Sequence, residues 1–209
     1  MTEVHPSEPH PIEAESYRIM RSRIDLSTLP PLTRAVTERI IHATADFDYV
    51  TDMVCDEMAL AAGVEALRRG APVIADVAMV ASGITGYPVI CRIGDSLCTR
   101  LARTANITLS AAAVRLAHGE AGPGAVWLVG CAPTALAEII SRQVEPALVI
   151  GVPVGFVGAA DAKDNLRASG LPALSNISEK GGSAVAVAAF NALLRIARKQ
   201  AGEHVKDSS

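Results

Sequence analysis

The chain has 209 residues, a formal net charge of −3 and 50% hydrophobic residues, but only 3% aromatic residues. The length fits one globular domain, and a core built from Ala, Val, Ile and Leu suits helices packed closely on a buried parallel sheet. The acidic balance, without a basic stripe and interleaved aromatics, argues against a nucleic-acid partner.

The two ends of the chain have little to bury. Residues 1–11 carry three prolines and two histidines, which predicts a flexible lead-in, and residues 203–209 predict a loose tail. Residues 12–202 are expected to form a single domain. The start of the sequence has no charged-then-apolar leader pattern. No apolar run reaches the roughly 18 residues of a membrane span, so we expect a cytoplasmic protein without a membrane partner.

Helical and strand patterns alternate between these ends. The predicted helices are Ile12–Arg23, Pro31–Thr44, Asp56–Arg69, Ser96–Arg103, Leu109–His118, Ala135–Val144, Ala160–Ala168 and Gly182–Lys199. The predicted strands are PVIADVAM (72–79), PVICRI (88–93), AVWLVG (125–130), ALVIGV (147–152) and ALSNIS (173–178). This alternation predicts right-handed crossovers and a mostly parallel sheet of about five strands. Ligands are then expected at the loops beyond the carboxyl ends of the strands.

Two glycine-rich loops lie at those ends. GVPVGFVGA (Gly151–Ala159) lacks the G-x-G-x-x-G spacing, so a dinucleotide site is weakly indicated. Its glycines can serve a sharp turn, or their N–H groups can bind an anion. In SEKGGSA, Gly181, Gly182 and Ser183 open the last helix, and Lys180 lies beside its positive end. They are compatible with an ordinary capped helix and with an anion pocket, and the residues alone leave both open.

The stretch ERIIHATADFDYVTD (Glu38–Asp52) ends a predicted helix with a histidine followed by three aspartates. His42 can be a proton donor, a metal ligand with Asp46, or the polar end of a helix satisfied by a backbone carbonyl. The residues alone favour the last. No third ligand appears at metal spacing, and the four cysteines show no C-x-x-C pattern. No metal site is therefore expected. Cys91, Cys98 and Cys131 are interpreted as small core residues.

Several segments together resemble one family, precorrin-8X methylmutase of corrin biosynthesis. They are SYRIMR (Ser16–Arg21), IIHA (Ile40–Ala43), APVIADVAMVASGIT (Ala71–Thr85), APTAL (Ala132–Leu136), GVPVGFVGA (Gly151–Ala159) and KGGSAVA (Lys180–Ala186). The resemblance implies a three-layer α/β/α, flavodoxin-like fold and a homodimer with sites near the interface. It also implies an isomerase that moves a methyl group from carbon 11 to carbon 12 of precorrin-8. Such a shift within one molecule requires no redox cofactor.

The resemblance also implies roles for residues. His42 matches the family's general acid, and a histidine can donate a proton near neutral pH. Asp46 is expected to support its protonated form, whereas Asp48 and Asp52 are expected to be solvated. Ser16, Tyr17 and Arg21 match a segment that contacts the tetrapyrrole, although an ordinary exposed helix face remains open for Arg21. Thr85 and Gly86 match a segment that lines the substrate.

Two features depart from the family pattern. The loop after Thr85 is short, and the family's TRSAAA is replaced by Thr108–Ala113, which puts Leu109 where an arginine is expected. Arg115 lies nearby as a possible substitute. Two other functions stay open: a non-catalytic corrinoid carrier on the same scaffold, and a nucleotide-binding regulatory domain suggested only by the glycine loops.

Overall fold

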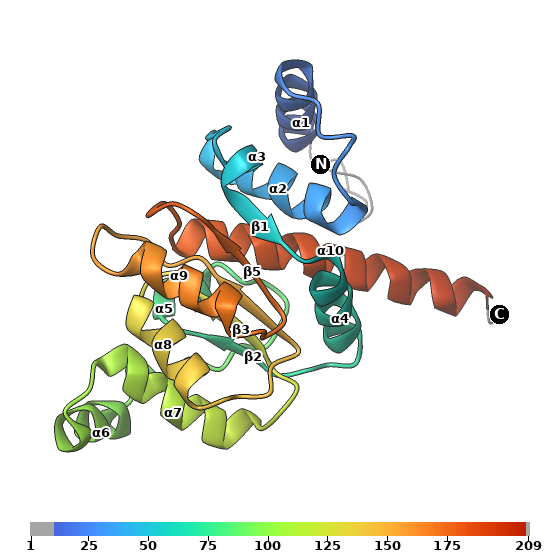
Figure 1. Cartoon of the computed structure of the whole chain (residues 1–209). Helices are drawn as coiled ribbons and strands as arrows, with labels where there is room; N and C mark the ends of the chain where they lie inside the picture. The colour runs from blue at the N-terminus through green and yellow to red at the C-terminus, as the bar shows by residue number, and fades with distance from the viewer. Residues whose placement is uncertain (1–10, 208–209) are drawn as a thin grey trace.

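The computed structural model describes the backbone of residues 11–207 and the side chains of residues 11–202. Figure 1 shows helices on both faces of a central sheet. The helices are α1 Pro11–Arg23, α2 Pro31–Thr44, α3 Tyr49–Asp52, α4 Glu57–Arg68, α5 Ala78–Ser82, α6 Ser96–Ala105, α7 Leu109–Ala121, α8 Pro133–Ser141, α9 Ala159–Ala168 and α10 Ser183–Asp207. The strands are β1 Met53–Cys55, β2 Val73–Ala75, β3 Val126–Val129, β4 Leu148–Gly151 and β5 Ala173–Asn176.

The sheet has the order β1-β5-β4-β3-β2. Strands β2 to β5 are parallel, and β1 pairs antiparallel with β5. One further parallel bridge joins Ile90 to Ile74 of β2. With the Ile90 segment placed outside β2, the parallel positions follow the flavodoxin-like order 2-1-3-4-5. The predicted fold class, with a mostly parallel sheet of five strands, is confirmed.

One strand prediction is wrong, and one strand of the sheet is not among the predicted ones. The segment 88–93 contributes a single bridge, in which Ile90 N–H donates to Val73 and the Ile90 carbonyl accepts from Ala75. Pro88 has no N–H with which to extend that ladder. The fifth strand is instead β1, which has three residues. A segment that short carries no readable alternation of apolar and polar positions.

The core has two large parts, one on each face of the sheet, and a small third cluster between α6 and α7. On one face α4 and α10 cover the sheet, and α2 packs on the outer side of α10. On the other face lie α7, α8 and α9, with Trp127 of β3 buried against them. Figure 1 shows α10 running between α2 and the sheet. The predicted three layers are therefore present, and α1 stands outside them on α2.

Most helices lie where the sequence predicts them. The bounds of α2 match the prediction, and α4 begins after Asp56, whose carboxylate accepts the Met58 N–H at 2.9 Å. At the C-terminus α10 continues to Asp207, so residues 203–207 are helical where a loose tail is predicted. The predicted N-terminal lead-in, apart from Pro11, lies outside the described residues. Within residues 11–207, no helix combines the length and apolar character needed to cross a membrane.

The two glycine loops are bonded to each other through the backbone. Gly155 N–H donates to the Glu179 carbonyl at 3.0 Å, and Gly182 N–H donates to the Val152 carbonyl at 2.9 Å. These amides are thereby engaged within the protein. The glycines serve sharp turns and close approach, which is one of the interpretations the sequence left open.

Gly181 is the position where this requirement is strictest. Its φ is +146°, and a Cβ atom there would lie 2.3 Å from the carbonyl oxygen of Val152 and 2.8 Å from that of Pro153. We expect Gly181→Ala to lower the free energy of unfolding by about 1–3 kcal/mol, measured by urea denaturation. Gly119→Ala is the control. Gly119 lies inside α7 with open space around it, so this change is expected to raise the free energy of unfolding by about 0.5–1 kcal/mol. Equal stability of Gly181→Ala and the wild type would contradict this interpretation of the loop.

Candidate active site

His42 lies in the last turn of α2 and faces α1. Its Nδ1 is 2.8 Å from the hydroxyl oxygen of Ser16, and its ring stacks on Tyr17 with centroids 5.1 Å apart and planes 2° from parallel. Ser16 and Tyr17 are half-buried neighbours on α1. The structure thus brings together three residues that the sequence proposes for one site.

The serine hydroxyl suits a histidine that changes protonation state. It can donate to Nδ1 of the neutral ring, and it can accept from Nδ1–H of the imidazolium. In both states Nε2 carries the proton that remains available. Among the described side chains, none makes a hydrogen bond to Nε2. The arrangement can therefore present an N–H donor to a ligand.

Arginines surround a cavity next to this group. Arg21 donates two hydrogen bonds to Glu38, at 3.0 and 2.7 Å, and its guanidinium lies 5.4 Å from the centre of the Tyr17 ring. The cavity has a volume of about 400 Å³. Besides three alanines, it is lined by Tyr17, Arg21, Glu38, Arg39, Arg195 and Ile196. Its mixture of guanidinium groups and apolar side chains suits a ligand that is apolar in its body and anionic at its edges.

The environment of His42 favours the neutral ring in the free protein. Burial lowers the pKa of His42, Arg39 and Arg195 act in the same direction, and Glu13 opposes them. The folded protein then binds fewer protons at His42 than the unfolded chain does, in the window between the lowered pKa and about 6.5. Stability therefore rises with pH across that window.

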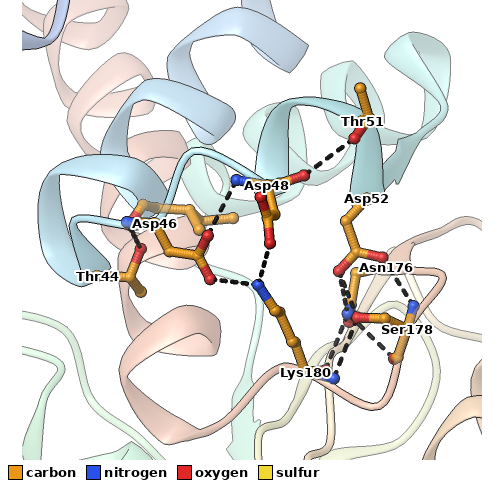
Figure 2. A network of polar contacts seen from close by, with 9 residues as sticks. Thr44, Asp46, Asp48, Thr51, Asp52, Asn176, Ser178 and Lys180 are labelled. Carbon is orange, nitrogen blue, oxygen red and sulfur yellow. Dashed lines mark hydrogen bonds and ion pairs between the residues drawn. The ribbon is translucent and has the colours of Figure 1, made fainter.

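Asp46 does not have its predicted role. Its carboxylate accepts from Lys180 Nζ at 2.7 Å, and Asp48 accepts from the same nitrogen at 2.6 Å (Figure 2). The carboxylate that acts on His42 is instead Glu13 of α1. The hydrogen bonds to Asp46 and Asp48 raise the pKa of Lys180. Lys180 therefore ties the loop before α10 to the loop after α2.

The prediction that Asp52 is solvated is wrong. It is buried, and it accepts hydrogen bonds from Asn176 Nδ2 at 2.8 Å, from the backbone N–H groups of Ile177 and Ser178 at 3.1 and 2.7 Å, and from the Ser178 hydroxyl at 2.8 Å (Figure 2). Burial raises its pKa, but these bonds outweigh burial and hold the pKa below its usual value. Asp52 therefore anchors the loop that follows β5.

Lys163 supports the same loop from α9. It is fully buried, and its Nζ donates to Asn176 Oδ1 at 2.9 Å, to the Lys180 carbonyl at 2.7 Å and to the Ser178 carbonyl. Burial lowers the pKa of Lys163 to about 8, while Asp52 opposes that effect. The sequence gives no sign that Lys163 is buried, because it is one of several charged residues in the segment that forms α9.

The other proposed site residues lie elsewhere along α10. The carbonyl of Gly86 accepts from Arg198 at 2.5 Å, so Thr85 and Gly86 lie beside the later turns of α10. Ser183 is the first residue of α10, and its Cα would lie 2.9 Å from a Cβ placed on Gly130 after β3. The structure thus places Ser183 at the carboxyl end of the sheet, away from Thr85 and Gly86.

The second of the two sequence departures, Leu109, lies in a different layer from His42. Leu109 is the exposed first residue of α7. Arg115, farther along α7, donates to Glu138 of α8 at 2.6 Å. Both helices cover the sheet face opposite to α10 and α2. Arg115 therefore does not take the place of the missing arginine beside His42 of the same chain.

A second residue that sequence analysis overlooked is Asp76, at the end of β2. Its buried carboxylate accepts the backbone N–H groups of Gly130, Cys131 and Ala132, at 3.2, 2.9 and 3.0 Å. These groups lead into α8 at the point between β2 and β3 where the strand order reverses, which is the usual ligand position in such folds. Here the chain's own carboxylate fills that position.

Comparison with known proteins identifies the chain's relatives. The family model described as precorrin-8X methylmutase matches residues 11–196. The chain belongs to the precorrin-8X methylmutase family. A curated relative, the cobalt-precorrin-8 methylmutase of Salmonella typhimurium, is 39% identical over 90% of this chain and 95% of its own length. The precorrin-8X methylmutase of Pseudomonas aeruginosa is 37% identical over 87% of this chain and 93% of its own length.

Solved structures agree. A precorrin-8x methyl mutase from Thermus thermophilus superposes with a TM-score of 0.83 at 36% identity, covering 90% of this chain and 96% of that one. The resemblance noted from the sequence is therefore confirmed. As a member of the precorrin-8X methylmutase family, the chain is an isomerase of cobalamin biosynthesis, which favours an enzyme over a carrier.

Proposed function

We propose that the chain moves a methyl group from carbon 11 to carbon 12 of precorrin-8, giving hydrogenobyrinic acid, with His42 as the general acid. The observation that carries this proposal is the Ser16–His42–Tyr17 group beside a cavity lined by arginines. It offers an N–H donor next to a place where a flat, polycarboxylated macrocycle can bind.

The chemistry asked of the protein is limited. Substrate and product are isomers, so a proton that His42 Nε2 gives to the ring system must be released again after the methyl group has moved. Ser16 can follow the ring of His42 through both protonation states. The remaining task is to hold the macrocycle in a reactive conformation. Binding energy used in this way lowers the activation free energy of the methyl shift.

Substrate carboxylates are assigned to cationic and polar groups around this cavity and along α10. Arg21 lines the cavity. Ser183 begins α10, and Lys180 lies in the loop before it. Thr85 and Gly86 lie beside the later turns of α10. Arg21 and Lys180 are paired with acidic side chains in the free protein. A substrate carboxylate would take over some of those bonds, which keeps the cost of desolvation low.

The proposal includes a homodimer in the cytoplasm with sites near the interface. Large apolar side chains are exposed in the loops after β4 and β5: Phe156 is 95% exposed, Val157 90% and Ile177 53%. A group of such side chains is typical of a surface that another protein covers. All four cysteines are free thiols, which fits a reducing compartment.

A conversion assay tests the function. Purified protein is mixed with metal-free precorrin-8 and, in a parallel sample, with its cobalt form, and the visible spectrum is followed. We expect the spectrum of the corrin product to develop over many turnovers, at unchanged mass. A substrate labelled with ¹³C in the methyl group on carbon 11 shows whether that group reaches carbon 12. Tight binding without conversion would overturn the proposal and favour a carrier.

A further inference from the structure

A partly buried carboxylate links three helices beside His42. Glu13 of α1 accepts from Arg39 of α2 at 2.7 Å and from Arg195 of α10 at 2.8 Å. The side chains of Glu13 and Arg39 are 19% and 25% exposed, whereas that of Arg195 is 58% exposed. Glu13 therefore fixes two guanidinium groups from different helices in one place.

These arginines are not fully used by Glu13. Each guanidinium has five N–H donors, and each gives one of them to Glu13. Both arginines also line the cavity of about 400 Å³, together with Tyr17. Two cations held side by side at the wall of a cavity form a suitable partner for a second carboxylate, supplied by a ligand.

The same groups determine the charge around His42. The charged side chains that act on it are Glu13 from α1, Arg39 from α2 and Arg195 from α10. Asp46 and Asp48, before α3, are paired with Lys180. From α4, Glu57 binds the backbone at the beginning of α2, near Leu32 and Thr33. His42 thus responds mainly to the Glu13–Arg39–Arg195 group.

We propose that Arg39 and Arg195 form a carboxylate subsite, positioned by Glu13, and that a ligand carboxylate bound there promotes protonation of His42. The ligand class is a macrocycle with carboxylate side chains. The biological role of this subsite rests on the proposed function. Ligand binding and the pKa of His42 can be measured without it. In the free protein the two arginines disfavour the imidazolium, and an added anion beside them offsets that effect. His42 then becomes an acid when substrate is present.

The assignment makes predictions of opposite sign for two variants. Glu13→Gln removes an anion and is expected to lower the pKa of His42 further. Arg195→Gln removes a cation and is expected to move that pKa back toward its usual value. NMR titration of the His42 ring in the free protein measures both. A purely structural role of these residues would not shift the pKa in opposite directions.

Binding is tested with uroporphyrin III, a macrocycle with carboxylate side chains. We expect it to raise the pKa of His42 in the wild type, and we expect Arg195→Gln to weaken binding about tenfold to hundredfold. The matched controls are Glu15→Gln and Arg18→Gln, an exposed ion pair on α1 with a distance of 2.6 Å. Both controls should leave the binding and the pKa of His42 unchanged.

Two results would overturn the inference: equal affinity of uroporphyrin III for Arg195→Gln and Arg18→Gln, or a His42 pKa that neither Glu13→Gln nor Arg195→Gln changes. These measurements need no turnover. If they succeed while precorrin-8 is not converted, the subsite stands and the proposed function fails. If precorrin-8 is converted but the pKa of His42 does not move, only the subsite fails.

Discussion

Replacing His42 with alanine is expected to lower kcat for conversion of precorrin-8 by roughly 10²–10⁴-fold, the usual contribution of a general acid. The change removes the imidazole that Ser16 and Tyr17 hold at the cavity. The affinity for substrate should change much less, because the arginines that line the cavity remain. Steady-state kinetics separates the two effects.

The control is His118→Gln. His118 lies on α7 near Trp127, in the layer opposite to α2, and it has no assigned role in the site. The kcat of His118→Gln should stay within about a factor of two of the wild-type value, as for a change outside the site. Circular dichroism and thermal unfolding show whether each variant keeps its fold. If folded His42→Ala works at the wild-type rate, the proposed mechanism is wrong even though the family assignment stands.

Asp52→Ala is expected to reduce the free energy of unfolding by about 3 kcal/mol or more, because it leaves buried partners unsatisfied. The donors that lose their carboxylate partner would be one N–H of Asn176 Nδ2, the Ser178 backbone N–H and the Ser178 hydroxyl. The Ile177 N–H keeps its bond to the backbone carbonyl of residue 52. The variant also removes the anion that supports the buried charge of Lys163. Urea denaturation at neutral pH measures the loss.

Asp48→Ala is the matched control from the same segment. The Asp48 side chain is 76% exposed and shares Lys180 with Asp46, so its removal should leave the urea midpoint almost unchanged. Equal loss in both aspartate variants would contradict the assigned network.

The stabilisation that Asp52 gives the wild type depends on pH. The pKa of Asp52 is lower in the folded state than in the unfolded chain. Its stabilisation is therefore complete above about pH 4 and is lost as the pH falls through the lowered value.

The sequence predicts most of the fold, because its long helices are periodic and its central strands lie in continuous apolar runs. The helix at Pro31–Thr44 and the strands around Trp127, Ile150 and Leu174 lie where hydrophobic periodicity places them. The exceptions are short elements: β1, α3 and α5 have three to five residues each. Their conformations depend on partners far along the chain, such as the pairing of Met53 with Asn176, and local patterns do not contain that information.

Only part of the candidate site can be predicted from the sequence. Ser16, Tyr17, Arg21 and His42 are identified together through the family resemblance. Helical spacing could have added Glu13, since it lies four residues before Tyr17 on the same face of α1. Arg195 could not be found this way, because α10 meets α2 only in the folded protein. The same holds for Asp46 and Asp52: only the folded loops show that one faces Lys180 and the other is buried.

The sheet borders described above have a consequence for how the protein resists self-association into fibrils. One border is β1, with three residues, and the other is the single bridge at Ile90, which follows Pro88. Long unpaired borders would offer backbone donors and acceptors to a strand from another molecule. Here neither border is long enough to template such growth. Contact with another molecule through continuation of the β-sheet is thereby disfavoured, whereas side-chain surfaces such as the exposed Phe156 loop stay accessible.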